Sequence, residues 1–458
     1  MPDHLGRHAV VIGGSIAGMT AARVLADYFG QVTVLERDLV ELQPVVHKSV
    51  PQGNHLHALM LGGQQVLSAL YPDFTDRLVK LGAVRFRFGI EAAFFFPAGK
   101  AYTPSGSVRS PRDLGVDGFS QSRGLLEHCV RQCSMEVANI KFEFGAAAES
   151  MIYENGQVGG VRFNRGGVAD SIAADLVVDA GGRGSRAPRW LREMGFAEPE
   201  ETVIGCDFAY TSAKFRKPPS YDGVERVMLF GGPPPKYTSG AGIGEIENDS
   251  WMVSVAGRFG DYPPSDEEGF MAFAKALPTH KFYNLIKDAE RISPITHHRF
   301  PTSVLRHYER LPAFPERFVV LGDAISSFNP VYGQGMSSAA KQAAALQGLL
   351  AERAAGAHGD GLKRLAAAFF PRAAEVVASP WILAAGADFA YPQTTGERPP
   401  SMDEGGRYFA ALDTLVVEDV NVHRLVTEVF QLARPLADLM SDPLRTRVLA
   451  RMAERAEK

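Results

Sequence analysis

The residues that could carry chemistry gather at three glycine-marked turns, each of which follows a short apolar run. The turns cover residues 13–18, 181–182 and 322–323. A strand that ends in such a turn and opens a helix leaves backbone N–H groups free at the positive end of the helix dipole, where a phosphate group binds. The order of the three turns therefore predicts one nucleotide-binding site assembled from distant parts of the chain.

The first turn matches the G-x-G-x-x-G pattern of dinucleotide-binding proteins, except that Ser15 takes the place of the middle glycine. Gly13 allows the tight turn, Gly18 lets the following helix approach the strand, and the small side chain of Ser15 still permits a pyrophosphate to come close. Glu36 ends the next predicted strand, where its carboxylate can accept hydrogen bonds from ribose hydroxyls and repels the 2′-phosphate of NADP. This turn therefore predicts a site for FAD or NAD.

Two histidines and a polar turn supply the candidates for catalysis. His55 and His57 follow a Pro/Gly turn, and Asn329 and Tyr332 bracket Pro330 after the third glycine turn. Two residues in i,i+2 positions at a helix start face different ways, so only one histidine can face a cofactor, and His57 is preferred. A structural role, as a cap or a support of the turn, stays an equal alternative for all four. The chain shows no nucleophile elbow and no H-E-x-x-H motif.

Composition excludes several classes of partner. The 458 residues carry a formal net charge of -4, so a basic surface for nucleic acid or an anionic membrane is not expected. Three cysteines and the lack of an apolar run of about 18 residues favour reduced thiols and no integral membrane segment. The polar start, with Asp3, His4 and Arg7 ahead of a strand, does not resemble a secretory signal. We predict a cytoplasmic protein that acts on a small molecule.

Periodic patterns indicate the elements that must position these residues. A βαβ unit is predicted over residues 8–35, a helix over residues 54–71 and strands over residues 84–97. Between residues 203 and 298 short strands alternate with Pro and Gly turns, which favours a mainly antiparallel sheet; residues 240–244, Gly-Ala-Gly-Ile-Gly, are interpreted as one of those turns. After residue 318 the α/β pattern returns and the chain ends in helices.

The third glycine turn and the segment after it resemble the second FAD fingerprint of the class A flavoprotein monooxygenases, whose type fold is that of p-hydroxybenzoate hydroxylase. The matching residues are 319–324 and 329–336, and the resemblance spans essentially the whole chain. It implies that Asp323 binds the flavin-side ribose and that the turn from Pro330 to Met336 lies against the isoalloxazine ring. It also implies that Arg123 reaches the FAD phosphates or ribose, with an exposed helix-start arginine as the alternative.

The middle turn departs from the family, which usually places an Asp-Gly pair where this chain has Gly181-Gly182, with Asp179 two residues earlier. FAD stays the predicted cofactor, and NADPH or NADH is the expected transient reductant. The predicted FAD-binding residues are Gly13, Gly14, Ser15, Ile16, Ala17, Gly18, Glu36, Arg37, Arg123, Asp179, Gly181, Gly322, Asp323, Pro330, Gly333, Gln334, Gly335 and Met336.

The resemblance implies an α/β fold, in which a Rossmann-like FAD-binding domain carries an inserted, mainly antiparallel β-sheet substrate domain and a helical C-terminal region. The predicted segments are residues 1–80, 113–202 and 313–375 for the FAD-binding domain, 81–112 for strands that enter the substrate domain, 203–312 for the substrate domain and 376–458 for the C-terminal helices.

Within the family the chain resembles a subgroup of bacterial polyene and polyether epoxidases and, more distantly, squalene epoxidase. The residues that carry this are 51–57, 327–336, Pro380-Trp381, Asp388 and Tyr391-Pro392. The implied activity inserts one oxygen atom from O2, by epoxidation or hydroxylation, into a hydrophobic polyene or polycyclic aromatic substrate through a flavin C4a-hydroperoxide. A separate flavin reductase is a possible partner.

Aromatic residues at strand spacing suggest a large apolar substrate, although core packing is the alternative for each of them. The predicted substrate residues are Phe94, Phe96, Phe230, Trp251 and Trp381.

Three other functions stay open. A flavin-dependent halogenase should carry a Trp-x-Trp-x-x-Pro element and a lysine between flavin and substrate, and the segment from Trp251 to Val255 lacks the second tryptophan and the proline. A prenyl-chain flavin reductase or dehydrogenase would work without O2. A non-catalytic FAD-binding protein is the alternative from another class, and the altered middle turn favours it.

Overall fold

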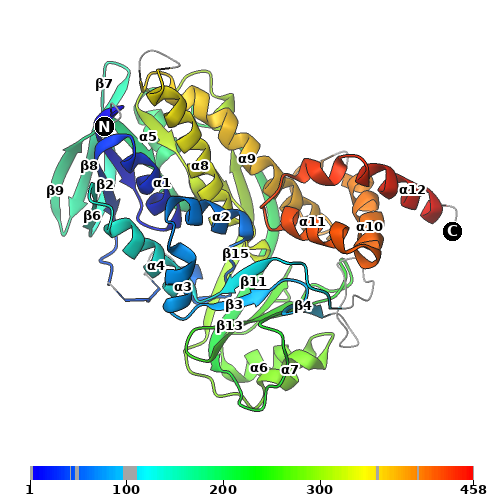
Figure 1. Ribbon diagram of the computed structural model, residues 1–458. Helices are drawn as coiled ribbons and strands as arrows, with labels where there is room; N and C mark the ends of the chain where they lie inside the picture. The colour runs from blue at the N-terminus through cyan, green and yellow to red at the C-terminus, as the bar shows by residue number, and fades with distance from the viewer. Residues whose placement is uncertain are drawn as a thin grey trace.

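The computed structural model describes residues 4–41, 43–46, 51–95, 111–356, 361–399 and 402–456. A five-stranded parallel sheet, ordered β16-β10-β1-β2-β6, organises the larger part of the molecule (Figure 1). Its strands are β1 (Gly6–Ile12), β2 (Phe29–Glu36), β6 (Ile140–Phe144), β10 (Leu176–Asp179) and β16 (Phe318–Val320). The strands come from three separate stretches of sequence, and this arrangement confirms the predicted α/β, Rossmann-like class.

Both faces of the parallel sheet are covered, which explains why β10 and the second half of β1, from Ala9 to Ile12, are buried at every position. Helix α1 (Ile16–Ala26) packs on β2, α8 (Gly335–Ala354) packs on α1, and α9 (Leu365–Asp388) packs on α8. On the other face lies a three-stranded antiparallel sheet of β7 (Ala146–Glu154), β8 (Gln157–Arg165) and β9 (Val168–Ala173). A two-residue turn at Asn155-Gly156 joins β7 to β8, and both residues have positive φ angles, 50° and 81°.

A second sheet of seven strands, ordered β17-β15-β11-β14-β13-β12-β4, lies below the first in Figure 1. All its neighbouring strands are antiparallel except β12 and β4. Its strands are β4 (Ala92–Phe95), β11 (Glu201–Arg216), β12 (Val227–Phe230), β13 (Gly240–Ile246), β14 (Ser250–Arg258), β15 (Thr296–Arg306) and β17 (Ser326–Ser327). Strands β3 (Val84–Arg87) and β5 (Asp117–Ser120) form a separate pair.

The glycines at 240–244 lie within strand β13, so the prediction of a turn there is wrong. A Cβ atom on Gly242 or Gly244 would lie 2.7 or 2.6 Å from the side chain of Leu56. Alternate glycines therefore make room for the segment around Leu56, which crosses this face of the sheet. Ile243, between them, points to the opposite face and is fully buried there.

That opposite face of the large sheet packs on helices α6 (Glu267–Ala276) and α7 (His280–Ile286). The Phe230 ring lies 5.2 Å from the rings of both Phe95 and Phe282, and Trp251 is 1% exposed in the same cluster. These contacts make Phe230 and Trp251 part of the sheet–helix core, whereas the sequence predicted that they would contact substrate.

The predicted helix over residues 54–71 is shorter in the structure. A 3-10 turn, η1 (Pro51–Asn54), is followed by non-helical backbone, and helix α2 (Leu61–Leu70) begins only afterwards. The N–H of Leu56 donates to the Ser254 hydroxyl at 3.2 Å and the N–H of Met60 donates to the Ser337 hydroxyl at 3.0 Å. Side chains from distant elements thus take the hydrogen bonds that a helix would have made.

Sequence reasoning did not predict α6 and α7, although both carry N-caps. The Asp266 side chain accepts from the N–H of Gly269, and the Thr279 hydroxyl accepts from the N–H of Lys281. The remaining helices of the two-sheet region are α3 (Phe74–Lys80), α4 (Arg123–Met135) and α5 (Ala187–Glu193).

Three helices near the C-terminus form a bundle with a core of its own, to one side of the sheets (Figure 1). They are α10 (Met402–Glu418), α11 (Val420–Phe430) and α12 (Leu444–Ala456). The carbonyl of Leu432 accepts from Lys341 Nζ at 2.8 Å, and the carbonyl of Gln431 accepts from the N–H of Gly62 at 2.9 Å. These hydrogen bonds dock the bundle on α2 and α8.

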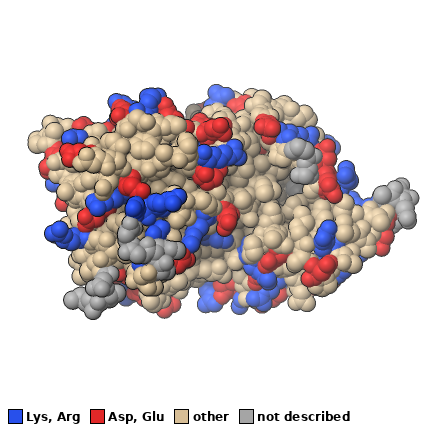
Figure 2. All heavy atoms as spheres, turned by 90° about the horizontal axis from the view of Figure 1, so that it is seen from above, with Lys and Arg blue, Asp and Glu red and all other residues tan. Residues whose placement is uncertain are grey.

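Figure 2 shows Lys and Arg interspersed with Asp and Glu over the face seen from above. None of the described helices is long and apolar enough to cross a membrane. The three cysteines are free and buried.

The placement of Phe230 leads to a stability prediction. Phe230→Ala should lower the free energy of unfolding by about 3–5 kcal/mol, because it removes a buried ring from a packed core. Denaturant unfolding measures this change. The matched variant Leu229→Ala, which alters the other face of the same strand, should cost clearly less because Leu229 is only half-buried. A cost for Phe230→Ala below that of Leu229→Ala would contradict the core assignment.

Candidate functional site

The three glycine turns meet at the carboxyl ends of three adjacent strands, β16, β10 and β1. Ile12 pairs with Asp179, and Asp179 pairs with Val320. The N–H of Ala180 donates to the carbonyl of Ile12, and the N–H of Leu321 donates to the carbonyl of Asp179, both at 2.9 Å. Ligands of α/β proteins bind at such a carboxyl edge.

The first turn is packed so closely that only glycine fits at two positions. Gly13 has a φ angle of 99°, and a Cβ atom there would lie 2.6 Å from the carbonyl oxygen of Ala180. A Cβ atom on Gly18 would lie 1.8 Å from the carbonyl oxygen of Gly13. Ser15 is the N-cap of α1, yet its side chain makes no capping hydrogen bond. The first N–H groups of α1, from Ile16 and Ala17, therefore stay available to a phosphate.

Glu36 holds the loop from the end of β2. Its Oε2 accepts from the N–H of Gly14 at 2.7 Å, and its Oε1 accepts from the N–H of Asp38 at 2.8 Å. Each carboxylate oxygen has a second lone pair, so Glu36 can still accept from ribose hydroxyls. Arg37 follows at the strand end and is exposed.

The Ser15 hydroxyl does not cap α1 and donates instead to Glu127 on α4. Arg123, at the start of the same helix, donates to Ser15 Oγ at 2.8 Å and to Glu127 Oε1 at 2.9 Å. Glu127 is 0% exposed. Burial acts to raise its pKa, but Arg123 and the Ser15 hydroxyl hold that pKa below its usual value. Arg123 is thus fixed beside the first turn.

Sequence reasoning missed Glu127. Its spacing of four residues from Arg123 was the available signal, since residues four apart on a helix share one face.

The third turn supplies an acidic group without a partner. The half-buried carboxylate of Asp323 accepts no hydrogen bond from the described residues, and burial raises its pKa to about 6 against the opposing charges of Arg123 and Arg183. Gly322 has a φ angle of 75°, and a Cβ atom there would lie 2.9 Å from that of Ala17. Asp323 is therefore positioned close to the start of α1, where a ribose hydroxyl would satisfy it.

Helix α8 begins next to Asp323. A Cβ atom on Gly335 would lie 3.5 Å from Asp323 Oδ1. The N-cap of α8, Gln334, makes no capping hydrogen bond, and its Oε1 is buried without a partner among the described residues. Met336 follows in the first turn. The open ends of α1 and α8, with the unpaired Asp323, fit an FAD molecule that lies across this edge.

The middle turn is supported from beneath. Asp179 is 0% exposed, and its carboxylate accepts from the N–H of Gly181 at 2.8 Å and from the Ser185 hydroxyl. This placement makes Asp179 a support of the turn, whereas the sequence predicted a contact with the cofactor. Arg183 donates to the carbonyl of Thr302 at 2.7 Å and to the Ser327 hydroxyl at 3.0 Å, which ties the turn to the large sheet.

The segment after the third turn forms a 3-10 turn, η5 (Pro330–Tyr332), that ends at Gly333 with a φ angle of 68°. Asn329 accepts from the N–H of Val331 at 3.2 Å. Asn329 and Tyr332 both donate from their side chains to Asp388 of α9. The structure therefore directs these two candidate catalytic side chains into the protein, where they hold the turn.

The two histidines face different neighbours. The Nδ1 atom of His57 lies 3.0 Å from the carbonyl oxygen of His55, and burial together with the charge of Arg123 lowers the pKa of His57 to about 4. The charge of Arg123, which lies beside the first turn, thus acts on the His57 ring. The Nδ1 atom of His55 lies 2.7 Å from Ser212 Oγ, and its ring lies 4.2 Å from that of Tyr210 on the large sheet.

The other predicted substrate residues are spread over the large sheet and α9. Phe94 pairs with Leu229, which pairs with Gly242, so it belongs to the face that Leu56 crosses. The Trp381 ring lies 6.2 Å from that of Phe328. Phe96 lies outside the described residues.

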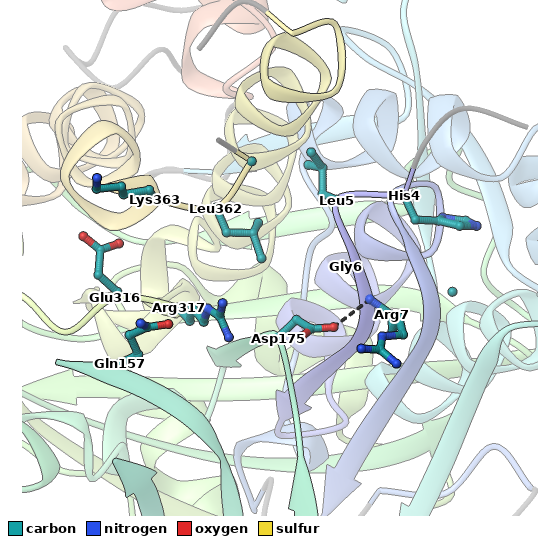
Figure 3. Close-up of a pocket in the computed structure, with 12 residues that line it drawn as sticks. His4, Leu5, Gly6, Arg7, Gln157, Asp175, Glu316, Arg317, Leu362 and Lys363 are labelled. Carbon is teal, nitrogen blue, oxygen red and sulfur yellow. Dashed lines mark hydrogen bonds between the residues drawn. The ribbon is translucent and has the colours of Figure 1, made fainter. Parts of the chain in front are cut away.

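A cavity of about 710 Å³ lies at the other edge of the parallel sheet, near the amino ends of its strands (Figure 3). Gly6, Asp175 and Arg317 contribute to its wall, and Asp175 accepts there from the N–H of Arg7 at 2.6 Å. This cavity is therefore distinct from the edge at which the glycine turns meet.

A parallel sheet with three glycine turns at one edge, joined to a large and mainly antiparallel sheet, defines the two-sheet class of FAD-binding oxidoreductases. Solved structures share this fold. The flavin-dependent brominase Bmp2 matches with a TM-score of 0.68 at 14% identity over 98% of this chain and 100% of that one. An oxygenase of 2-methyl-3-hydroxypyridine-5-carboxylic acid matches with a TM-score of 0.56 at 15% identity over 84% and 90% of the two chains.

Sequence relatives give the family. No protein-family model matches the chain. Protein Rv3254 of Mycobacterium tuberculosis is 33% identical over 404 residues, which cover 86% of this chain and 82% of that protein. Squalene epoxidase 3 of Arabidopsis thaliana is 24% identical over 74% of this chain and 59% of its own length. The chain belongs to the class A FAD-dependent monooxygenase family, FAD is its cofactor, and NADH or NADPH is the usual reductant of the class.

The position of Glu36 leads to a test of the FAD cradle. Glu36→Arg should remove the ribose acceptor and the hydrogen bond to Gly14, so the ratio of flavin to protein absorbance after purification should fall. Glu154→Arg makes the same change of charge on the exposed β7–β8 hairpin and should leave that ratio unchanged. An equal ratio in both variants would count against this placement of FAD.

The buried histidines predict how stability depends on pH. Burial, with smaller contributions from the neighbouring histidines, lowers the pKa of His55 from 6.5 to about 3. The unfolded chain therefore takes up a proton on His55 below pH 6.5 that the folded chain does not take up until about pH 3. The stability from the neutral ring is fully present above pH 6.5 and is lost as the pH falls toward 3.

His55→Gln should therefore show a smaller loss in free energy of unfolding between pH 7 and pH 5 than the wild type, by about 1–2 kcal/mol. Denaturant unfolding at the two pH values measures the difference. His280→Gln, at an exposed position at the start of α7, serves as the control. The idea fails if His55→Gln and the wild type lose stability in parallel.

Proposed function

We propose that this protein is an FAD-dependent monooxygenase that inserts one oxygen atom from O2, by epoxidation or hydroxylation, into a hydrophobic polyene or polycyclic aromatic substrate. The observation that carries the proposal is the meeting of three glycine turns and two open helix N-termini at one edge of the parallel sheet, joined by Arg183 to the large sheet. The relatives support the same class, since squalene epoxidase 3 matches over most of the chain.

The chain's own residues would hold the cofactor at defined places. The first turn and the N-terminus of α1 would bind the pyrophosphate, while Glu36 and Asp323 would accept from ribose hydroxyls. Arg123 would add positive charge beside the phosphates. The N-terminus of α8, at Gly335 and Met336, would stabilise negative charge on the reduced ring. When bound, FAD supplies the electrons that activate O2.

The large sheet favours an apolar substrate. Phe208, Tyr210 and Phe300 form an aromatic cluster on strands β11 and β15, and Tyr210 lies beside His55. The His55 ring stays neutral near pH 7, because burial lowers its pKa to about 3. These aromatic rings suit a substrate that is extended and apolar rather than a small charged acid. Arg183 and Arg258 lie over the Phe300 and Phe208 rings at 4.7 and 5.2 Å, and both already donate to acceptors within the protein. Phe94 and Trp381 remain proposed contacts.

His57 is the proposed polar group beside the ring of the cofactor. Burial and Arg123 lower its pKa to about 4, so it is neutral near pH 7 and can either donate or accept a hydrogen bond. A neutral imidazole can orient a substrate by a hydrogen bond without bringing a charge into the site. This is compatible with an apolar site from which water is excluded.

An isotope experiment tests the proposed reaction. The FAD-loaded protein, supplied with NADPH or NADH or with a flavin reductase, should incorporate one atom of 18O from 18O2 into a lipophilic polyene or polycyclic aromatic, as measured by mass spectrometry. A panel of such compounds should also show which of them accelerates reductant consumption. Incorporation of 18O from labelled water instead would contradict the proposal.

Added chloride and bromide separate the oxygenase from the halogenase, whose fold the chain shares with Bmp2. Oxygenation predicts that halide leaves the product unchanged, whereas a halogenated product would establish the other activity. Turnover without O2 would indicate a prenyl-chain reductase or dehydrogenase. A bound flavin that neither NADH, NADPH nor a reductase can bleach would indicate a non-catalytic FAD-binding protein.

A further inference from the structure

One carboxylate oxygen receives three hydrogen bonds from three different parts of the chain. Asp388 Oδ1, at the end of α9, accepts from Arg258 of β14 at 2.7 Å, from Asn329 Nδ2 at 2.9 Å and from the Tyr332 hydroxyl at 2.6 Å. Arg258 also donates to the Tyr332 oxygen at 3.1 Å. The second oxygen of Asp388, Oδ2, is buried and has no partner among the described residues.

The group is enclosed. Asp388 is 1% exposed, Asn329 is 0% exposed and Arg258 is 6% exposed. The Arg258 guanidinium lies between two rings, 5.2 Å from that of Phe208 and 4.9 Å from that of Tyr391. These contacts fix the cation and, through it, the carboxylate, because a stacked guanidinium has one orientation for its donors.

The turn at 329–333 has few other anchors. Its backbone hydrogen bonds are local, from Tyr332 to Asn329 and from Gly333 to Pro330. The side-chain hydrogen bonds that the described residues give it from outside all come from Asp388 and Arg258. Burial and the Asp388 charge raise the pKa of Tyr332 well above its usual value, so its hydroxyl stays protonated and remains a donor.

We propose that Asp388 is the positioning residue of this turn: it joins α9, the large sheet and the 329–333 segment at a single oxygen atom and thereby sets where the turn lies against the flavin. This inference rests on the proposed function in one respect, namely that the 329–333 turn faces the ring of the bound flavin. In this proposal the side chains of Asn329 and Tyr332 hold the turn in place by donating to Asp388, and they do not contact substrate. It also links the substrate sheet to the flavin, since Arg258 belongs to β14.

Asp388→Asn tests this role because it keeps the size of the side chain and removes the charge that Arg258 pairs with. The matched control is Glu245→Gln on β13. Glu245 is 6% exposed and accepts from Lys217 at 3.0 Å and from Arg226 at 2.8 Å. It belongs to the same sheet as Arg258 and makes no hydrogen bond to the described 329–333 turn. Both variants lose one buried carboxylate charge, so their thermal unfolding midpoints should fall by similar amounts.

Three readouts that need no substrate distinguish a positioning role from general stability: the visible spectrum of bound flavin, its midpoint potential, and the dissociation constant for FAD measured by fluorescence titration of the apoprotein. Asp388→Asn should shift the flavin bands and potential and weaken FAD binding by about tenfold, whereas Glu245→Gln should leave all three unchanged. Unchanged readouts in Asp388→Asn, or equal shifts in the control, would overturn the proposal.

Tyr332→Phe is the second variant, for the case in which Asp388→Asn does not fold. It keeps the Arg258–Asp388 pair and removes one donor, so it should shift the same readouts in the same direction by a smaller amount. No shift would again contradict the role of Asp388. Titration of the wild type comes first: a protein that binds no FAD refutes the proposed function, whereas one that binds FAD but oxygenates nothing leaves the positioning test intact.

Discussion

The register of three parallel strands is the constraint on which the rest of the structure depends. Ile12, Asp179 and Val320 lie side by side because strands from distant parts of the chain are hydrogen-bonded in parallel. Only this register brings three turns to one edge, and only glycine at position 18 lets α1 start in contact with the first turn. Backbone pairing, with the close-packed core beneath it, thus sets the distance between the start of α1 and Asp323. Side chains then refine a site that the main chain has already formed.

Polar connections complete what the apolar cores leave undetermined. The parallel sheet and the large sheet each pack around a separate core. Arg183 joins them at Thr302 and Ser327, and Asp388 joins the end of α9 to β14. Hydrogen bonds have fixed directions, whereas apolar contacts tolerate sliding, so such networks specify how two packed bodies meet. The edge at which the glycine turns meet is thereby held at a defined distance from the large sheet.

Local spacing predicted the parts of this structure that depend on neighbours in the sequence. The first glycine turn, Glu36 and the class of fold follow from a strand, a turn and a helix in succession. Long-range contacts decided the rest. Leu56 and Met60 have helical spacing, but the hydroxyls of Ser254 and Ser337 take their N–H groups. Phe94 and Phe230 lie on opposite faces of the large sheet, because Phe230 pairs with Phe95 and not with Phe94. Side-chain alternation along a strand does not show which of the two faces packs against helices α6 and α7. Glycines in β13 resembled a turn because the side chain that needs their space, Leu56, is far away in the sequence.

The serine in the first turn illustrates how a departure from a motif is accommodated elsewhere in the chain. Its hydroxyl is bound by Glu127, a residue that also holds Arg123 and has no exposure to solvent. Position 15 and position 127 are therefore expected to show epistasis in homologues. A glycine at position 15 would restore the consensus motif, but the buried carboxylate of Glu127 would then lose one hydrogen-bond donor. We therefore expect homologues to differ at positions 15 and 127 together rather than at one of them alone.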